Sequence, residues 1–143
     1  MARRSLSLFA LFALLAALAA PVAAEIVVIV HPESSVRALS TQQISDLYLG
    51  RLRAIDGTPV QLLDLADDTS LRMRFFKSIN GMDLPRVNAY WARLQFSGNV
   101  LAPLQIANPE ALREAVSRNR RAIGYIEASQ VTAQVRVILA LRD

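Results

Sequence analysis

The segment from Asp67 to Arg74 carries residue types that could hold a small anion. Thr69 and Ser70 supply hydroxyl groups at the predicted start of a helix, and Arg72 and Arg74 follow within the next turn. The first backbone N–H groups of a helix have no partner within it, and the helix dipole favours negative charge there. The pattern therefore predicts that an oxyanion contacts Asp67, Thr69, Ser70, Arg72 and Arg74.

Two other interpretations of this segment stay open. Asp67, Asp68 and Thr69 are residue types that cap helices, so the pattern is also that of an ordinary helix start. Asp64, Asp67 and Asp68 could instead attract Ca²⁺ or Mg²⁺, although their spacing is not that of an EF-hand loop. The chain has no cysteine and one histidine, so we expect neither a zinc site nor a disulfide. We expect no resident metal and no cofactor.

His31 is a further candidate ligand-binding residue. It follows an apolar run over 26–30 and precedes Pro32. Open α/β sheets bind ligands beyond the carboxyl ends of their strands, so His31 could line a cleft, or it could be a solvated turn residue. No Gly-x-Ser-x-Gly motif accompanies it. We therefore expect a protein that binds and does not catalyse.

Residues 1–24 have the three parts of a secretory signal peptide. Arg3 and Arg4 form the charged start, an apolar run covers 6–20, and small residues precede the predicted cleavage site before Glu25. The alternative, an uncleaved membrane anchor, needs about 20 apolar residues. We expect residues 25–143 to be exported to the periplasm as one domain, with no transmembrane segment after cleavage.

The charge of the exported part does not favour nucleic acid as a partner. The chain has 16 basic and 12 acidic residues, and removing Arg3 and Arg4 with the leader leaves 14 against 12. Nucleic-acid-binding domains usually have a strongly basic surface. Arg118, Arg120 and Arg121 gather at the predicted end of a helix, where they either complement the helix dipole or form a docking patch for an acidic partner.

Alternating strands and helices must position these residues. Strands are predicted over 26–30, 60–65, 104–106, 122–126 and 135–141, of which the first, uniformly β-branched, should be covered on both faces. Helices are predicted after the capping residues at 40, 67–69, 83 and 108, with a turn over 51–57. This order predicts an α/β domain with a mixed sheet of about four or five strands flanked by helices.

Helical spacing predicts which side chains of the segment after Thr69 are buried. Leu71, Phe75 and Ile79 recur every four residues. They should form the buried stripe of a helix, which places Arg72, Arg74 and Lys77 mostly on the other face.

We expect Trp91, Tyr125 and Gly124 to have packing roles and no direct role in binding. Trp91 shares a helical stripe with Val87 and Leu94, so we expect it in the core and not stacked on a base or sugar. Tyr125 is expected to pack inside the sheet, and Gly124 to permit close backbone approach within it.

Four stretches, over 26–32, 39–50, 90–98 and 122–126, resemble the periplasmic solute-binding proteins of phosphate ABC transporters. More closely, the chain resembles a short, single-domain, exported branch of that family. The resemblance implies a single-lobe periplasmic-binding-protein-like domain that binds phosphate or another small oxyanion for an ABC transporter. Full-length relatives close two lobes over the phosphate, whereas this chain has the length of about one.

The family's phosphate motif runs Arg-x-Asp-Gly-Ser-Gly-Thr, and the matching stretch is 65–71. Asp67 matches and Thr69 keeps a hydroxyl, but Leu65 stands in place of the Arg and Asp68 in place of the first Gly. These differences favour the alternative function, a ligand-less interaction or structural module of the cell envelope that binds a protein partner. A homodimer could restore a cleft with two walls.

Overall fold

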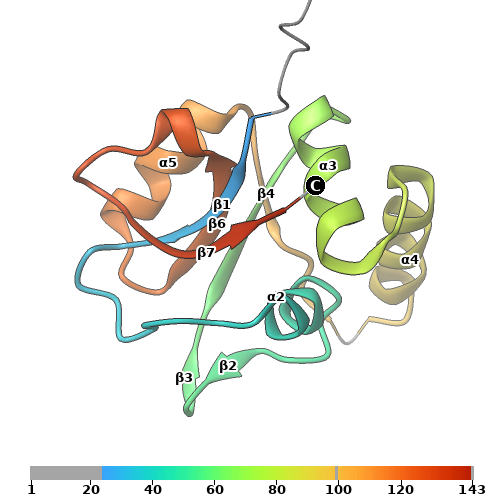
Figure 1. Ribbon diagram of the computed structural model, residues 1–143. Coiled ribbons are helices and arrows are strands. Elements are labelled where there is room, and N and C mark those ends of the chain that lie inside the picture. Colours follow the sequence, from blue (N-terminus) through green and yellow to red (C-terminus); the bar gives the residue numbers. More distant parts are fainter. Residues whose placement is uncertain (1–23, 99, 143) are drawn as a thin grey trace, which may run out of the picture.

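A five-stranded mixed sheet forms the centre of the computed structural model, which describes residues 24–142 except Asn99 (Figure 1). Its strands are β1 (Ile26–Val30), β4 (Gln61–Leu65), β5 (Leu104–Ile106), β6 (Ala122–Glu127) and β7 (Arg136–Leu141), in the spatial order β5-β4-β6-β1-β7. The predicted α/β class and strand number are confirmed. The predicted leader lies outside the described residues, apart from Ala24.

The strand directions distinguish the two ends of the sheet. β4 runs parallel to β5 and to β6, while β1 runs antiparallel to both of its neighbours, β6 and β7. In the β1–β6 register, Ile26 lies opposite Glu127 and Val30 opposite Ile123. We call the end where β4 and β6 finish the exit end and the end where they begin the entry end. β1 therefore finishes at the entry end.

The four α-helices of the described residues are α2 (Thr41–Tyr48), α3 (Ser70–Asn80), α4 (Leu84–Phe96) and α5 (Pro109–Arg118). Three predicted helix starts are confirmed. Ser40 caps α2 in a capping box with Gln43, Asp83 caps α4, and Asn108 caps α5. Because each cap satisfies a backbone N–H of the first turn locally, these starts do not depend on distant residues.

The prediction for the segment over 51–57 was wrong. The segment over 51–57, expected to be a turn, contains the first strand of a hairpin formed by β2 (Ala54–Ile55) and β3 (Thr58–Pro59). Asp56 and Gly57 join the strands with φ angles of 48° and 77°. Asp-Gly is a favoured pair for such a tight connection, because both residues tolerate positive φ. A single turn of 3-10 helix, η1 (Ala128–Gln130), follows β6.

Different helices cover the two faces of the sheet (Figure 1). On one face, Gly124 lets α5 approach so closely that an added Cβ would lie 2.5 Å from Leu112. We expected Gly124 to permit close approach within the sheet, but its close neighbour is helix α5. On the other face, Tyr125 stacks on Phe75 of α3 with ring centroids 3.7 Å apart, and Tyr48 of α2 contacts Phe75 edge-on. The predicted packing role of Tyr125 is confirmed.

Helix α4 is held against the end of α2. Trp91 is buried and its Nε1 donates a hydrogen bond to the carbonyl oxygen of Tyr48 at 3.1 Å. The hydroxyl of Tyr90 donates to the carbonyl oxygen of Leu49 at 2.6 Å. The expected core position of Trp91 is confirmed. Within the described part of the chain, every helix is too short or too polar to span a bilayer.

Candidate functional site

The turn between β4 and α3 lies at the exit end of the sheet. Of the three predicted capping residues, Thr69 caps the helix, since its Oγ1 accepts a hydrogen bond from the backbone N–H of Arg72 at 3.2 Å. The N–H of Thr69 donates to the carbonyl oxygen of Asp67 at 2.8 Å, which tightens the turn. The side chains of Asp67 and Ser70 are exposed.

Arg72 does not lie on the solvent face of α3, where the helical spacing placed it. The residue is only 3% exposed, and its Nε and Nη2 each donate to Oδ2 of Asp64 at 3.0 Å. Asp64, on β4, is itself buried. A buried carboxylate is stable only with a charged or hydrogen-bonded partner. Arg72 is therefore buried because it pairs with Asp64.

Further hydrogen bonds join this ion pair to its surroundings and form a network around Arg72 and Asp64. Nη1 of Arg72 donates to Oδ1 of Asp68 at 2.9 Å and to Oδ1 of Asn88 at 3.0 Å. Asp64 also accepts from the hydroxyl of Tyr125 at 2.5 Å and from the backbone N–H of Leu65 at 2.8 Å. All three nitrogens of the guanidinium thus donate to groups of the protein.

The network changes the acid–base behaviour of its members. Burial raises the pKa of Tyr125 well above its ordinary value, and the charge and hydrogen bond of Asp64 raise it further. The pKa of Tyr48 is raised for the same main reason, burial, with a contribution from Asp64. Burial alone would lower the pKa of Arg72, but the hydrogen bonds and charge of Asp64 outweigh it, so that pKa is raised. Arg72 stays a cation.

Two further predicted site residues, Arg74 and His31, are not available at the turn. Arg74 has other partners, and His31 lies elsewhere. Arg74 donates to the carbonyl oxygen of Ala24, and its Nη1 lies 3.5 Å from Oε1 of Glu127. His31 lies at the entry end, because β1 runs antiparallel to β6, and its Nδ1 accepts from the N–H of Glu33 at 3.0 Å. The structure therefore brings together Asp67, Thr69 and Ser70, and separates them from His31.

What remains at the turn is a mixed environment for an anion. The start of α3 and the hydroxyls of Thr69 and Ser70 can donate hydrogen bonds. The carboxylates of Asp67 and Asp68, both at the surface, repel negative charge. The carboxylate of Asp64 is engaged by Arg72, and no cluster of three metal-ligating side chains occurs among the described residues.

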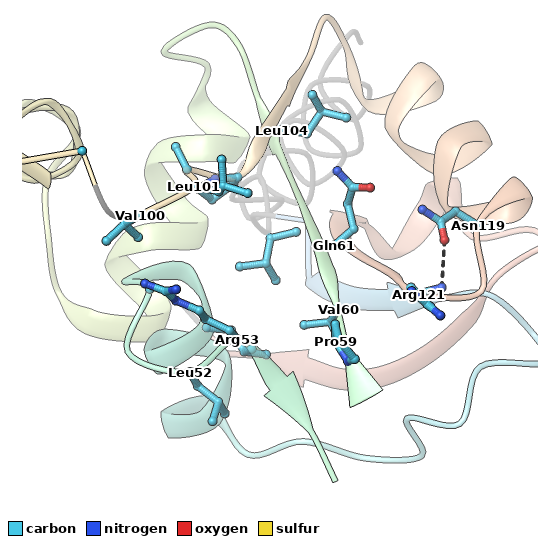
Figure 2. A pocket seen from close by; sticks show the side chains of 16 residues that line it. Leu52, Arg53, Pro59, Val60, Gln61, Val100, Leu101, Leu104, Asn119 and Arg121 are labelled. Atoms are coloured by element: carbon cyan, nitrogen blue, oxygen red, sulfur yellow. Dashed lines mark hydrogen bonds between the residues drawn. The ribbon is translucent and has the colours of Figure 1, made fainter. Parts of the chain in front are cut away.

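Sequence reasoning missed a groove of 920 Å³ at the entry end of the sheet (Figure 2). It lies between the end of α2, the loop from α4 to β5, and the first residues of β4. Most of its lining is apolar, and its polar side chains are Arg53, Gln61, Asn119 and Arg121. These residues come from several distant segments, so no local spacing could have grouped them. The signal that the sequence offers is the apolar content of this loop, over 100–103.

No protein-family model and no curated protein matches this chain. Several solved structures do. A candidate phosphate ABC transporter substrate-binding protein with bound phosphate from Clostridium perfringens has a TM-score of 0.64 at 21% identity. An ABC-type phosphate transport receptor from Vibrio cholerae has 0.63 at 14%, and PstS from Borrelia burgdorferi has 0.61 at 8%.

Each match covers 80% of this chain but only 44%, 45% and 46% of the respective solved chains. The chain thus spans less than half the length of these structures. At such low identities the likeness shows the fold alone. The predicted periplasmic-binding-protein-like α/β fold is confirmed.

Proposed function

We propose that this protein is an exported, non-enzymatic solute-binding domain that holds a small oxyanion against the start of α3. It acts as one wall of a cleft, and a second wall is contributed by another protein surface, either a second copy or an envelope protein such as an ABC transporter. The observation that carries the proposal is the exposed start of α3 at the exit end, in a fold shared with phosphate-binding proteins.

The contacts at this end explain why a second wall is needed. Arg72 and Arg74 both have protein partners, so neither presents an uncommitted charge to a ligand. A phosphate dianion on this domain alone would meet backbone N–H groups and the hydroxyls of Thr69 and Ser70, together with the carboxylates of Asp67 and Asp68. We therefore expect the isolated domain to bind phosphate weakly.

The same carboxylates support a second candidate function, that of an interaction module without a ligand. Asp68 stands where the related motif has a glycine, and its Oδ1 lies 2.9 Å from Nη1 of Arg72. If this pair is permanent, the anion site has been lost and the domain serves only to bind a protein partner.

Substitution of Asp68 by Asn distinguishes the two functions. Removing this carboxylate takes away repulsion of about 1 kcal/mol, so the Asp68→Asn variant should bind phosphate about fivefold more tightly than the wild type. Isothermal titration calorimetry with phosphate and with sulfate, at an ionic strength matched by chloride, measures the affinities. Sedimentation in the same buffers tests whether phosphate favours a dimer.

Asp56→Asn is the matched control, since it removes the same charge from the exposed β2–β3 turn, and it should leave phosphate binding unchanged. Ser70→Ala in the Asp68→Asn background should weaken binding again. Failure of both the wild type and Asp68→Asn to bind either oxyanion would overturn the solute-binding proposal and leave the interaction module.

A further inference from the structure

The groove at the entry end has a size and a lining suited to a small molecule. Its 920 Å³ lies within the range of about 300–1,000 Å³ typical of small-molecule sites. Leu52, Val60, Leu62 and Val100 contribute an apolar wall. Leu101 and Leu104 also line it and are 95% and 50% exposed. Apolar side chains exposed around a concavity are typical of a binding site.

The charged residues of the groove are of one sign. Arg53 and Arg121 line it on either side of the first residues of β4, as Figure 2 shows, and its described lining contains no acidic residue. Arg121 has its backbone held, because its N–H donates to Oδ1 of Asn119 at 2.9 Å and its carbonyl oxygen accepts from the N–H of Gln61 at 2.8 Å. Within the described part of the chain, its guanidinium makes no ion pair. This cation is available to a ligand.

We propose that the groove binds a small amphiphilic carboxylate, with its apolar chain on the leucine and valine side chains and its carboxylate on Arg121. An apolar wall next to a cation matches an apolar body that ends in an anion, and a planar carboxylate can accept two hydrogen bonds from one guanidinium. This site is separate from the proposed oxyanion site, which lies at the opposite end of the sheet. Either proposal can fail without the other.

The chain carries a natural reporter for this site. Trp91 is its only tryptophan. The ring lies against the groove lining, because a Cβ added to Gly50 would be 3.1 Å from Cη2 of Trp91 and 3.1 Å from Cγ1 of Val100. A ligand that enters the groove therefore changes the environment next to the ring without touching the exit end.

The test is a titration of the purified protein with octanoate, followed by tryptophan fluorescence and by equilibrium dialysis of labelled octanoate. We expect saturable binding that octylammonium and inorganic phosphate do not reproduce. Arg121→Gln should weaken octanoate binding about tenfold, the equivalent of one charge-assisted hydrogen bond. Leu101→Asp should abolish it, and since this side chain is exposed the fold should be retained.

Arg118→Gln is the matched control, because this exposed arginine lies at the end of α5 outside the groove and pairs with Glu114. It should leave the affinity unchanged. Absence of saturable binding by dialysis would overturn the proposal. Equal affinity for octylammonium, or an Arg121→Gln variant that binds like the wild type, would also overturn it, since the arginine would then not select the anion.

Discussion

Replacing Arg72 by Met tests whether this arginine is a structural residue. The substitution keeps an apolar side chain of similar length and removes the guanidinium. Asp64 then loses its hydrogen bonds from Nε and Nη2 and keeps only those from the hydroxyl of Tyr125 and the N–H of Leu65. The carboxylate remains buried without its cation.

The expected loss of stability follows from the burial of both partners, whose side chains are 4% and 5% exposed. Removing one partner of a buried ion pair costs about 3–5 kcal/mol. For a domain of this size each kcal/mol lowers the melting temperature by about 4 °C, so Arg72→Met should lower it by roughly 12–20 °C. Adding Asp64→Asn removes the uncompensated charge and should restore about 2 kcal/mol of this loss.

The assays are urea-induced unfolding, which gives the free energy of unfolding, and thermal unfolding, which gives the melting temperature, both followed by tryptophan fluorescence and far-ultraviolet circular dichroism. Lys77→Met is the control, since this exposed residue lies on the same helix and should change stability by less than about 0.5 kcal/mol. A loss below about 1 kcal/mol for Arg72→Met, as for a surface ion pair, would refute the reasoning. The arginine would then be able to leave Asp64 and turn toward a ligand.

Two further predictions concern the core. The raised pKa values of Tyr48 and Tyr125 mean that the unfolded chain ionises first as the pH increases. The contribution of these two residues to the free energy of unfolding should therefore be constant below about pH 10 and fall above it by about 1.4 kcal/mol per pH unit for each tyrosine. Urea unfolding at several pH values above about 10 measures how steeply the free energy of unfolding falls with pH, and this slope should be halved in Tyr125→Phe. An unchanged slope would show that Tyr125 is not one of its causes. Gly124→Ala should destabilise the domain by about 1–3 kcal/mol, because its Cβ would overlap Leu112 of α5, and Leu112→Ala should make the same substitution nearly neutral. Equal losses in both backgrounds would show that this contact is not the cause.

The amino-acid sequence by itself determined the elements and their limits where the signal is local. Ser40, Asp83 and Asn108 cap helices because their side chains bond to N–H groups three residues further along. The β-branched run over 26–30 forms an interior strand because its stiff, apolar side chains fit a sheet covered on both faces. The fold class follows from the alternation of these elements.

Only the tertiary structure decided what the polar residues do. Helical spacing treats Arg72 as a surface cation, but Asp64, eight residues earlier on a strand, draws it into the core. The sequence pattern predicts both His31 and Thr69 as ligand-binding residues, yet the antiparallel course of β1 puts them at opposite ends of the sheet. The groove joins segments as far apart as Leu47 and Arg121. Helix caps and strands depend on neighbours in the chain. Ion pairs and cavities, by contrast, depend on residues that only folding brings together.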